Sequence, residues 1–426
     1  MSIGRQVFEF LKAASIQHAR WDFEVSMSIL KNRRRMLILL ALIVPILAVS
    51  FLEAGDMIGS KTAYAPAFYS TNIFLVSIAI GLCAGLITGC IGAGGGFIIT
   101  PALMAAGVKG ILAVGTDLFH IFAKAIMGTA VHKKLGNVSV KLAAAFLVGS
   151  AGGTFIGGYI NKSLYDYDPL LSEAFISLVY AVLLGFLGFY ALNDFLKSRK
   201  ADSGDHGAHG GPSGIPALAV KVQSLKIPPV LTFDEDFGGR NISGVIVAMG
   251  GVVVGLMAAI MGVGGGFITF PMFVYVFGVS SMTTVGTDIL QIIFTAGLAA
   301  VTQYAIYGYV FYTLAMGMLL GSLIGIQVGA LTTKVVKGIH IRGFYAISIL
   351  AGFINRVATL PKKMVELEMI NLSKDLVKNI ESVGNIIFWI VVAFFAVWVI
   401  GKFVANIGKL RGEEEEISPV LVKEEA

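Results

Sequence analysis

The sequence has little charge, little cysteine and no motif of a known catalytic site. Charged residues make up 14% of its 426 positions, whereas a soluble domain has about a quarter. Its two cysteines, Cys83 and Cys90, lie about 10 Å apart along one predicted helix, too far for a disulfide. No His/Cys cluster, Ser/His/Asp set, HExxH, paired-carboxylate motif or nucleotide-binding loop occurs. We therefore expect no metal, no cofactor and no catalytic residue, and neither an enzyme nor a primary pump.

Apolar residues dominate the chain instead. They make up 56% of it, the mean hydropathy is +0.83, and several long apolar runs are present. This composition predicts an all-α polytopic membrane protein, with the lipid bilayer as its surroundings. The net charge of +6 requires no nucleic-acid partner, because Lys and Arg collect in the loops predicted below to be cytoplasmic.

One stretch of the chain occurs twice. G-L-I-T-G-C-I-G-A-G-G-G-F-I-I-T-P at 85–101 returns as G-L-M-A-A-I-M-G-V-G-G-G-F-I-T-F-P at 255–271. V-G-T-D follows each copy, at 114–117 and at 285–288. L-V-G-S and L-L-G-S come later in the same order. Because order and spacing are both kept, these echoes indicate a duplicated unit.

The three adjacent glycines in each copy predict a break in a membrane helix. Each glycine costs a helix about 1 kcal/mol relative to alanine, so the helix should stop there and leave a short arm, at 97–106 and 267–277. Thr100, which precedes Pro101, offers another start for the first arm. A broken membrane helix present in both halves indicates a transporter's binding site. The alternative is that the glycines serve only close helix packing.

Basic loops orient the chain, because cytoplasmic loops carry an excess of Lys and Arg. All basic loops fall on one side only if each glycine unit is a re-entrant hairpin, which places the two repeats in opposite orientations. About eight full spans plus two re-entrant hairpins result. The expected order is a cytoplasmic N-terminal amphipathic segment or disordered tail (1–35), a first span and external loop (36–72), repeat 1 (73–196), a cytoplasmic Gly/Pro/His linker (197–242), repeat 2 (243–356), an external amphipathic segment (357–384), a last span (385–406) and a cytoplasmic acidic tail (407–426).

Several finer expectations follow from the same patterns. Long helices are expected at 111–131 and 283–307. We expect an external loop at 161–169, a short span around 344–354 and a helical amphipathic stretch over 363–382. In the linker, His206 and His209 could chelate a metal weakly, but a flexible linker explains them better.

Polar residues recur along one face of each long helix. Asp117, His120 and Lys124 are spaced i, i+3 and i+7, and Asp288 and Gln291 repeat the first two positions 171 residues later. Ionisable residues at membrane depth are functional candidates. The two aspartates are also explained as caps of helices that start after a V-G-T turn. His120 is a candidate proton carrier, since imidazole titrates near neutral pH, or it is a buried hydrogen-bonded side chain.

Lys124 is the candidate cation for a substrate anion. It lies nine residues before Lys133, about 13 Å along the helix, and therefore well inside the membrane. A structural ion pair with Asp117 or Glu173, or snorkelling to the surface, would also explain it.

The duplicated G-x-G-G-G-F-x-x-x-P, with V-G-T-D after each copy, resembles the TauE/SafE sulfite exporter family, also called the toluene-sulfonate uptake permease family. The resemblance covers about 73–195 and 245–404. It implies a secondary transporter that moves a small sulfur-containing anion, such as sulfite or an organosulfonate, across the cytoplasmic (inner) membrane. The N-terminal extension, the linker and the 363–382 segment depart from the common pattern and leave the particular substrate open.

The helix starts after the two glycine clusters are expected to meet around the anion, since helix N-termini attract negative charge. The alternative functions are an uncoupled anion channel and a transporter of another small anion. Protons are the candidate coupling ion, and a homo-oligomer is left open. The expected substrate-binding residues are Gly92, Gly94, Gly95, Gly96, Phe97, Pro101, Thr116, Asp117, His120, Lys124, Gly262, Gly264, Gly265, Gly266, Phe267, Pro271, Thr287, Asp288 and Gln291.

Overall fold

The computed structural model describes residues 71–91, 95–134, 139–201, 217–233, 239–333, 335–336 and 338–406. Several expectations lie outside these residues: the N-terminal segment, the first span, the acidic tail, His206 and His209, and two of the cluster glycines, Gly92 and Gly94.

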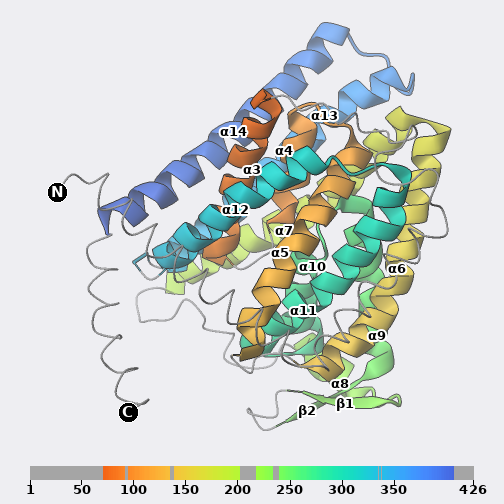
Figure 1. Cartoon of the computed structure of the whole chain (residues 1–426), viewed down its shortest axis with the longest axis vertical. Helices are drawn as coiled ribbons and strands as arrows, with labels where there is room; N and C mark the ends of the chain where they lie inside the picture. The colour runs from red at the N-terminus through yellow and green to blue at the C-terminus, as the bar shows by residue number, and fades with distance from the viewer. Residues whose placement is uncertain are drawn as a thin grey trace. The chain divides into compact units, whose positions relative to one another are not determined.

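The described chain is mostly helical (Figure 1). Its elements are α3 (Thr71–Ile91), α4 (Gly96–Ala105), α5 (Gly110–Lys134), α6 (Val140–Tyr167), α7 (Pro169–Ala201), α8 (Ala217–Ser224), β1 (Val230–Phe233), β2 (Arg240–Ser243), α9 (Gly244–Met261), α10 (Gly266–Pro271), the π-helical η2 (Met272–Phe277), α11 (Ser281–Ala299), the π-helical η3 (Ala300–Tyr304), the 3-10 turn η4 (Ala305–Tyr307), α12 (Tyr312–Thr333), α13 (Gly338–Glu366) and α14 (Lys374–Ala405).

Seven helices of the described residues are long and apolar enough to cross a membrane. They are α6, α7, α9, the stretch from Leu290 to Tyr307, α12, α13 and α14. Many of their large apolar side chains are exposed, among them Ile386, Ile390 and Phe394 of α14. Such a surface suits lipid rather than water, so a polytopic membrane protein is confirmed.

The leading helix of each repeat packs against a helix of the other repeat. The leading helix of the first repeat, α3, packs along α12 of the second repeat, and α9 packs along α6 in the same way (Figure 1). Glycines make this possible: a Cβ on Gly149 of α6 would lie 1.7 Å from the carbonyl oxygen of Ala248, and one on Gly85 of α3 would lie 2.5 Å from that of Ser322. Small residues let the backbones touch, as in other membrane helix pairs. Neither repeat can therefore pack its leading helix alone.

Equivalent helices of the two repeats also contact each other, and they run antiparallel. At one end of the α5–α11 pair, Gly115 of α5 lies against Tyr304, just after α11. At the other end, the N–H of Ser139, past the end of α5, donates to Oγ1 of Thr287, 3.0 Å away near the start of α11. The helices α7 and α13 form a second antiparallel pair.

The linker contains a small sheet that the all-α expectation missed. Strands β1 and β2 form an antiparallel pair, with Val230 opposite Ser243 and Phe233 opposite Arg240. Two side chains of the linker donate hydrogen bonds to the end of η2. Gln223 Nε2 donates to the carbonyl of Phe277, and Arg240 Nη1 donates to the carbonyl of Gly278, both at a distance of 2.7 Å. The described part of the linker is thus attached to the second arm.

Three helix boundaries correct the expectations. The expected loop at 161–169 is mostly helical, because α6 continues to Tyr167 and stops before Pro169. The span expected at 344–354 belongs to the 29-residue helix α13. The stretch 363–382 is not one helix, since α13 ends at Glu366 and α14 begins after Ser373, whose hydroxyl caps its start. Helical spacing of apolar residues across this turn was misleading.

Neighbouring glycines of α6 test the close packing of α6 on α9. A Cβ on Gly153 would lie 2.1 Å from the carbonyl oxygen of Val252, whereas one on Gly152 would have nothing within 4 Å. We expect Gly153→Val to destabilise the protein by about 3 kcal/mol or more, and Gly152→Val by less than about 1 kcal/mol. Thermal unfolding in detergent and abundance in the membrane measure the difference. Equal effects of the two substitutions would contradict this packing.

Candidate functional site

Both glycine clusters break a helix, and each break is followed by a helical arm. Gly95 precedes α4 with φ 74°, and Gly265 precedes α10 with φ 90°. Side chains are disfavoured in this left-handed region, so glycine is the residue that allows the chain to turn at these two points. The arm that starts at α4 is ten residues long, and α10 continues into η2. The expected arms are therefore confirmed.

The two breaks lie against each other. A Cβ on Gly96 would lie 2.9 Å from the Cα of Val263, in the second break. A Cβ on Gly264 would lie 2.6 Å from the side chain of Ile121, which also touches Gly96. Backbone of the second break therefore packs directly on the start of the first arm, and both lie beside the middle of α5.

Buried side chains satisfy the carbonyl groups at the end of α9. The amide of Asn161 donates to the carbonyl of Ile260 over 2.9 Å. The hydroxyl of Tyr304 donates to the carbonyl of Ala259, and that of Tyr180 to Met261. These carbonyls belong to the last turn of a helix and have no partner within it. Three different elements, α6, α7 and η3, thus stabilise the break.

In the first repeat, polar side chains form a chain across the middle of α5. Thr100 of α4 donates to Oδ2 of Asp117 over 2.9 Å, and Nδ1 of His120 lies 3.7 Å from Oδ1 of the same carboxyl group. On its other side, His120 shares a 3.0 Å hydrogen bond through Nε2 with Oγ of Ser322 in α12. All four residues are fully buried. Oδ1 of Asp117 and Nδ1 of His120 lie nearest each other, and among the residues that the structure describes neither has a hydrogen-bond partner.

Lys124 reaches the first glycine cluster. Its Nζ donates to Oγ1 of Thr88 over 3.4 Å, and a Cβ on Gly95 would lie 2.5 Å from the same oxygen. Glu173, the other expected partner of Lys124, lies beside Gly110 at the start of α5, fourteen residues before Lys124 and therefore about 21 Å away along the helix, and it pairs with Lys363. The ammonium group therefore lies beside the start of the first arm, rather than at the surface.

In the second repeat, Gln291 and Thr295 occupy the positions of His120 and Lys124 in the corresponding network. Gln291 donates from Nε2 to Oδ1 of Asp288 over 2.8 Å and to Thr269 over 3.2 Å. Thr295 donates to Oε1 of Gln291 over 2.8 Å and shares a 3.0 Å bond with Ser150 of α6. Asp288 also lies beside the second arm, since a Cβ on Gly266 would be 3.2 Å from its Oδ2.

Several expected roles need correction. Asp117 and Asp288 do not cap helix starts, because α5 begins at Gly110 and α11 at Ser281, well before them. Thr100 does not start the first arm, since α4 begins at Gly96. The expectation that Thr116 and Thr287 of the V-G-T-D motifs bind substrate stays a prediction.

Their observed contacts are with backbone. Thr116 Oγ1 accepts from the N–H of Phe311 over 2.9 Å, and Thr287 Oγ1 accepts from that of Ser139. Each therefore holds the backbone just before a helix, α12 and α6 respectively.

The remaining expected residues lie in or beside the two arms. Phe97 is buried and meets the ring of Tyr345 edge-on, 5.8 Å between centroids. Pro101 and Pro271 are inside the arms, where each removes one N–H from the helix ladder. The backbone of Phe267 belongs to α10.

Sequence reasoning missed several buried polar residues. The L-V-G-S and L-L-G-S echoes contain Ser150 and Ser322, so the repeat itself could have identified them. Arg356 of α13 is the largest fully buried side chain of the described residues, and it contacts α4. Its sequence signal is a single arginine in an apolar stretch, two residues beyond the short span expected at 344–354.

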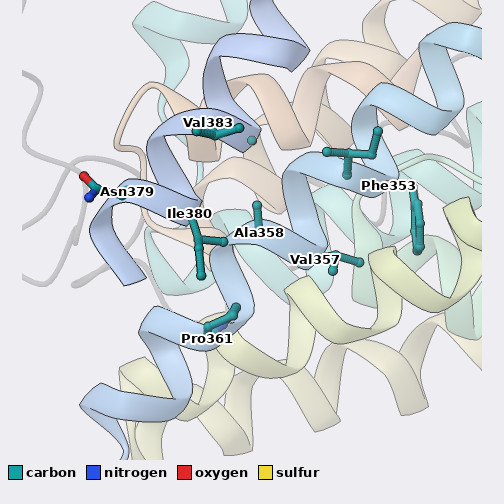
Figure 2. Close-up of a pocket in the computed structure, with 9 residues that line it drawn as sticks. Phe353, Val357, Ala358, Pro361, Asn379, Ile380 and Val383 are labelled. Atoms are coloured by element: carbon teal, nitrogen blue, oxygen red, sulfur yellow. The ribbon is translucent and has the colours of Figure 1, made fainter. Parts of the chain in front are cut away.

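A groove between α13 and α14 is not part of this site. It encloses about 490 Å³ and is lined by apolar side chains such as Phe353 and Val357 of α13 and Val383 of α14 (Figure 2). Asn379 is its one polar lining residue. No lining residue comes from the glycine clusters, α5 or α11. Its apolar character fits lipid contact rather than binding of a charged solute.

Comparisons with known proteins match this chain to membrane transporters. A family model described as sulfite exporter TauE/SafE matches residues 77–355, which include both glycine clusters. Probable membrane transporter protein YunE of Bacillus subtilis is 26% identical over 60% of this chain and 87% of its own length. Probable membrane transporter protein YjnA of the same organism is 24% identical, over 59% of this chain and 87% of its own length.

A probable membrane transporter protein of Xylella fastidiosa is 24% identical, over 60% of this chain and 84% of its own length. No solved structure matches this chain.

The first break can be tested with two glycines that flank α4. Gly95 and Gly107 both have positive φ, 74° and 90°, but only Gly95 is crowded, by Oγ1 of Thr88. We expect Gly107→Ala to cost about 1 kcal/mol of stability, the strain of the left-handed conformation alone. Gly95→Ala should cost at least about twice as much, because Thr88 must also move. Thermal unfolding of the two purified variants in detergent makes the comparison, and a Gly95→Ala variant as stable as Gly107→Ala would contradict the packing at this break.

Proposed function

The chain belongs to the TauE/SafE sulfite exporter family of membrane transporters, and we propose that it is a secondary transporter of a small sulfur-containing anion such as sulfite or an organosulfonate. The observation that carries this proposal is the meeting of the two breaks, each with a glycine in the left-handed conformation just before a helical arm. The anion binds between the two arm starts.

Backbone chemistry at the arm starts supports binding of an anion. The first N–H groups of a helix have no partner inside the helix, and the helix dipole places partial positive charge there. Because glycines precede both arms, the clusters place no side chain of their own over the backbone. Ile121 fills the space beside Gly96 and Gly264 in this conformation, so the anion binds when Ile121 moves aside. Lys124 adds a full positive charge beside the first arm. A ligand with several oxygens and one or two negative charges suits this arrangement.

Carboxyl groups beside both arms support coupling to protons. Asp117 and Asp288 are buried next to the arms, where an ionised carboxylate would repel the anion. A proton on the carboxyl group removes that repulsion. The unpartnered Oδ1 of Asp117 and Nδ1 of His120, 3.7 Å apart, provide a place where one added proton would be shared. Anion and proton then bind together and cross in the same direction.

The antiparallel pairing of equivalent helices supports alternating access. Antiparallel pairs α5–α11 and α7–α13 are expected when one repeat is inverted relative to the other in the membrane. In this topology α4 opens the route from one face and α10 from the other. We place both termini in the cytoplasm and the protein in the cytoplasmic membrane, from the basic loops. Homo-oligomer formation is compatible with this arrangement.

Transport in proteoliposomes tests the function. We expect saturable uptake and counterflow of labelled sulfite or an organosulfonate by the full chain. With one coupled proton, a gradient of one pH unit should drive about tenfold accumulation of a monovalent anion. Empty liposomes and nitrate are the controls. Flux that ignores the proton gradient would favour an uncoupled channel, preferential transport of nitrate would favour another small anion as substrate, and no flux of any sulfur-containing anion would refute the proposal.

Lys124 is tested against its structural alternative. If it balances the substrate charge, Lys124→Met should raise the KM by at least about tenfold, and Lys124→Arg should raise it less. If Lys124 instead serves only to neutralise Asp117, removing both charges in Lys124→Met/Asp117→Asn should restore wild-type affinity. Lys162→Met, at a half-exposed lysine of α6, controls for loss of one positive charge. Wild-type affinity of the double variant would rule out a direct role of Lys124 in binding.

A further inference from the structure

Arg356 is a buried positive charge that the transport site described above does not use. It lies on α13 and is 1% exposed. Its guanidinium contacts α4, where Nη2 lies 3.4 Å from the carbonyl oxygen of Pro101 and Nη1 lies 3.2 Å from Sδ of Met104. Both Nε and Nη2 also donate to Oδ1 of the adjacent Asn355.

The partners of Arg356 are all neutral. Within the part of the chain that the structure describes, no carboxylate lies within 4 Å of its guanidinium. An arginine stays charged in proteins, so burial without a counter-ion is costly. Two carboxylates act on it from beyond 4 Å, Glu173 and Glu381, and each of them is already paired with a lysine. An ionisable side chain inside a membrane protein is by default a functional candidate.

One edge of the guanidinium makes only weak hydrogen bonds. Oδ1 of Asn355 takes the edge formed by Nε and Nη2. The end formed by Nη1 and Nη2 meets a thioether sulfur, which is a weak acceptor, and a carbonyl at the long distance of 3.4 Å. Two parallel N–H groups on this end match the oxygen pair of a sulfite, sulfonate or carboxylate group.

From α13, Arg356 contacts α4, the arm that starts at the central site. Pro101, which it contacts, directly follows Thr100, the donor to Asp117. Pro101 is five residues after the start of α4 at Gly96, which is about 7.5 Å along the arm. The guanidinium therefore lies farther along the arm than the break, toward the end of α4 that leads away from it.

We propose that Arg356 forms a second anion subsite on the transport route, beside the first arm, where the oxyanion is held before or after it occupies the break. This rests on the proposed function. The end of the guanidinium made by Nη1 and Nη2 binds two oxygens of the anion, which replaces the weak contacts to Met104 and Pro101. Asn355 fixes the side chain so that this end faces α4. The subsite favours oxyanions over halides, because only an oxyanion offers two suitably spaced acceptors.

The structural alternative is that Arg356 only stabilises α4, by donating to a carbonyl near the negative end of the helix. Kinetics and abundance together separate the two roles. Arg356→Gln removes the charge, and Arg356→Lys keeps the charge but loses the bidentate geometry. Lys363→Gln is the matched control, since Lys363 lies two turns farther along α13 and its charge is paired with Glu173.

The experiment measures labelled sulfite counterflow in proteoliposomes, with methanesulfonate and chloride as competitors and membrane abundance as a parallel readout. We expect Arg356→Gln to raise the KM for sulfite at least about tenfold, and Arg356→Lys about fivefold with weaker competition by methanesulfonate than in the wild type. Lys363→Gln should stay within about twofold.

Each outcome decides the proposal. Wild-type KM in Arg356→Lys and in Arg356→Gln would overturn it, while counterflow by the wild type would leave the proposed function standing. Failure of Arg356→Lys to accumulate in the membrane would also overturn it, because a positive charge alone would then be insufficient to hold α13 on α4. Absence of sulfite and methanesulfonate transport by the wild type would refute the proposed function, and this subsite with it.

Discussion

The structure depends on satisfying the backbone groups that two helix breaks free inside an apolar surrounding. A buried backbone group without a partner is costly, so the protein must supply donors for the carbonyls that a buried helix end leaves free. The end of α9 shows how this is done, since Asn161, Tyr180 and Tyr304 each donate to one of its last carbonyls. The polar side chains of α6, α7 and η3 are therefore placed where the second break needs them.

Each repeat is completed by the other. His120 of the first repeat bonds to Ser322 of the second, and Thr295 of the second bonds to Ser150 of the first. The leading helices are exchanged in the same manner, α3 on α12 and α9 on α6. A shift of one repeat against the other must therefore alter polar contacts at both breaks at once. Such shared contacts are what a two-state rearrangement between opposite openings requires.

Much of this arrangement could be predicted from the sequence, because a pattern that occurs in both halves of the chain is unlikely to be chance. Three adjacent glycines located the breaks, and the spacing of Asp117, His120 and Lys124 placed them on one helix face. Boundaries were harder: the apolar periodicity over 363–382 crosses a turn, which the helix cap at Ser373 reveals only in three dimensions. Arg356 was missed because its burial is produced by contacts with α4, which lies about 250 residues earlier in the chain.

The two halves of the site differ in charge, and this difference has a physical consequence. In the second repeat, Gln291 and Thr295 close a neutral network in which Asp288 Oδ1 has a donor. In the first repeat, the equivalent positions are His120 and Lys124, and the network leaves Asp117 Oδ1 and Nδ1 of His120 without partners. An added proton creates a new hydrogen bond in the open network, whereas Asp288 Oδ1 in the closed network already has its donor. In the proposed mechanism, the first arm, with Lys124 beside its start, is therefore the one whose state depends more strongly on the proton and the anion together.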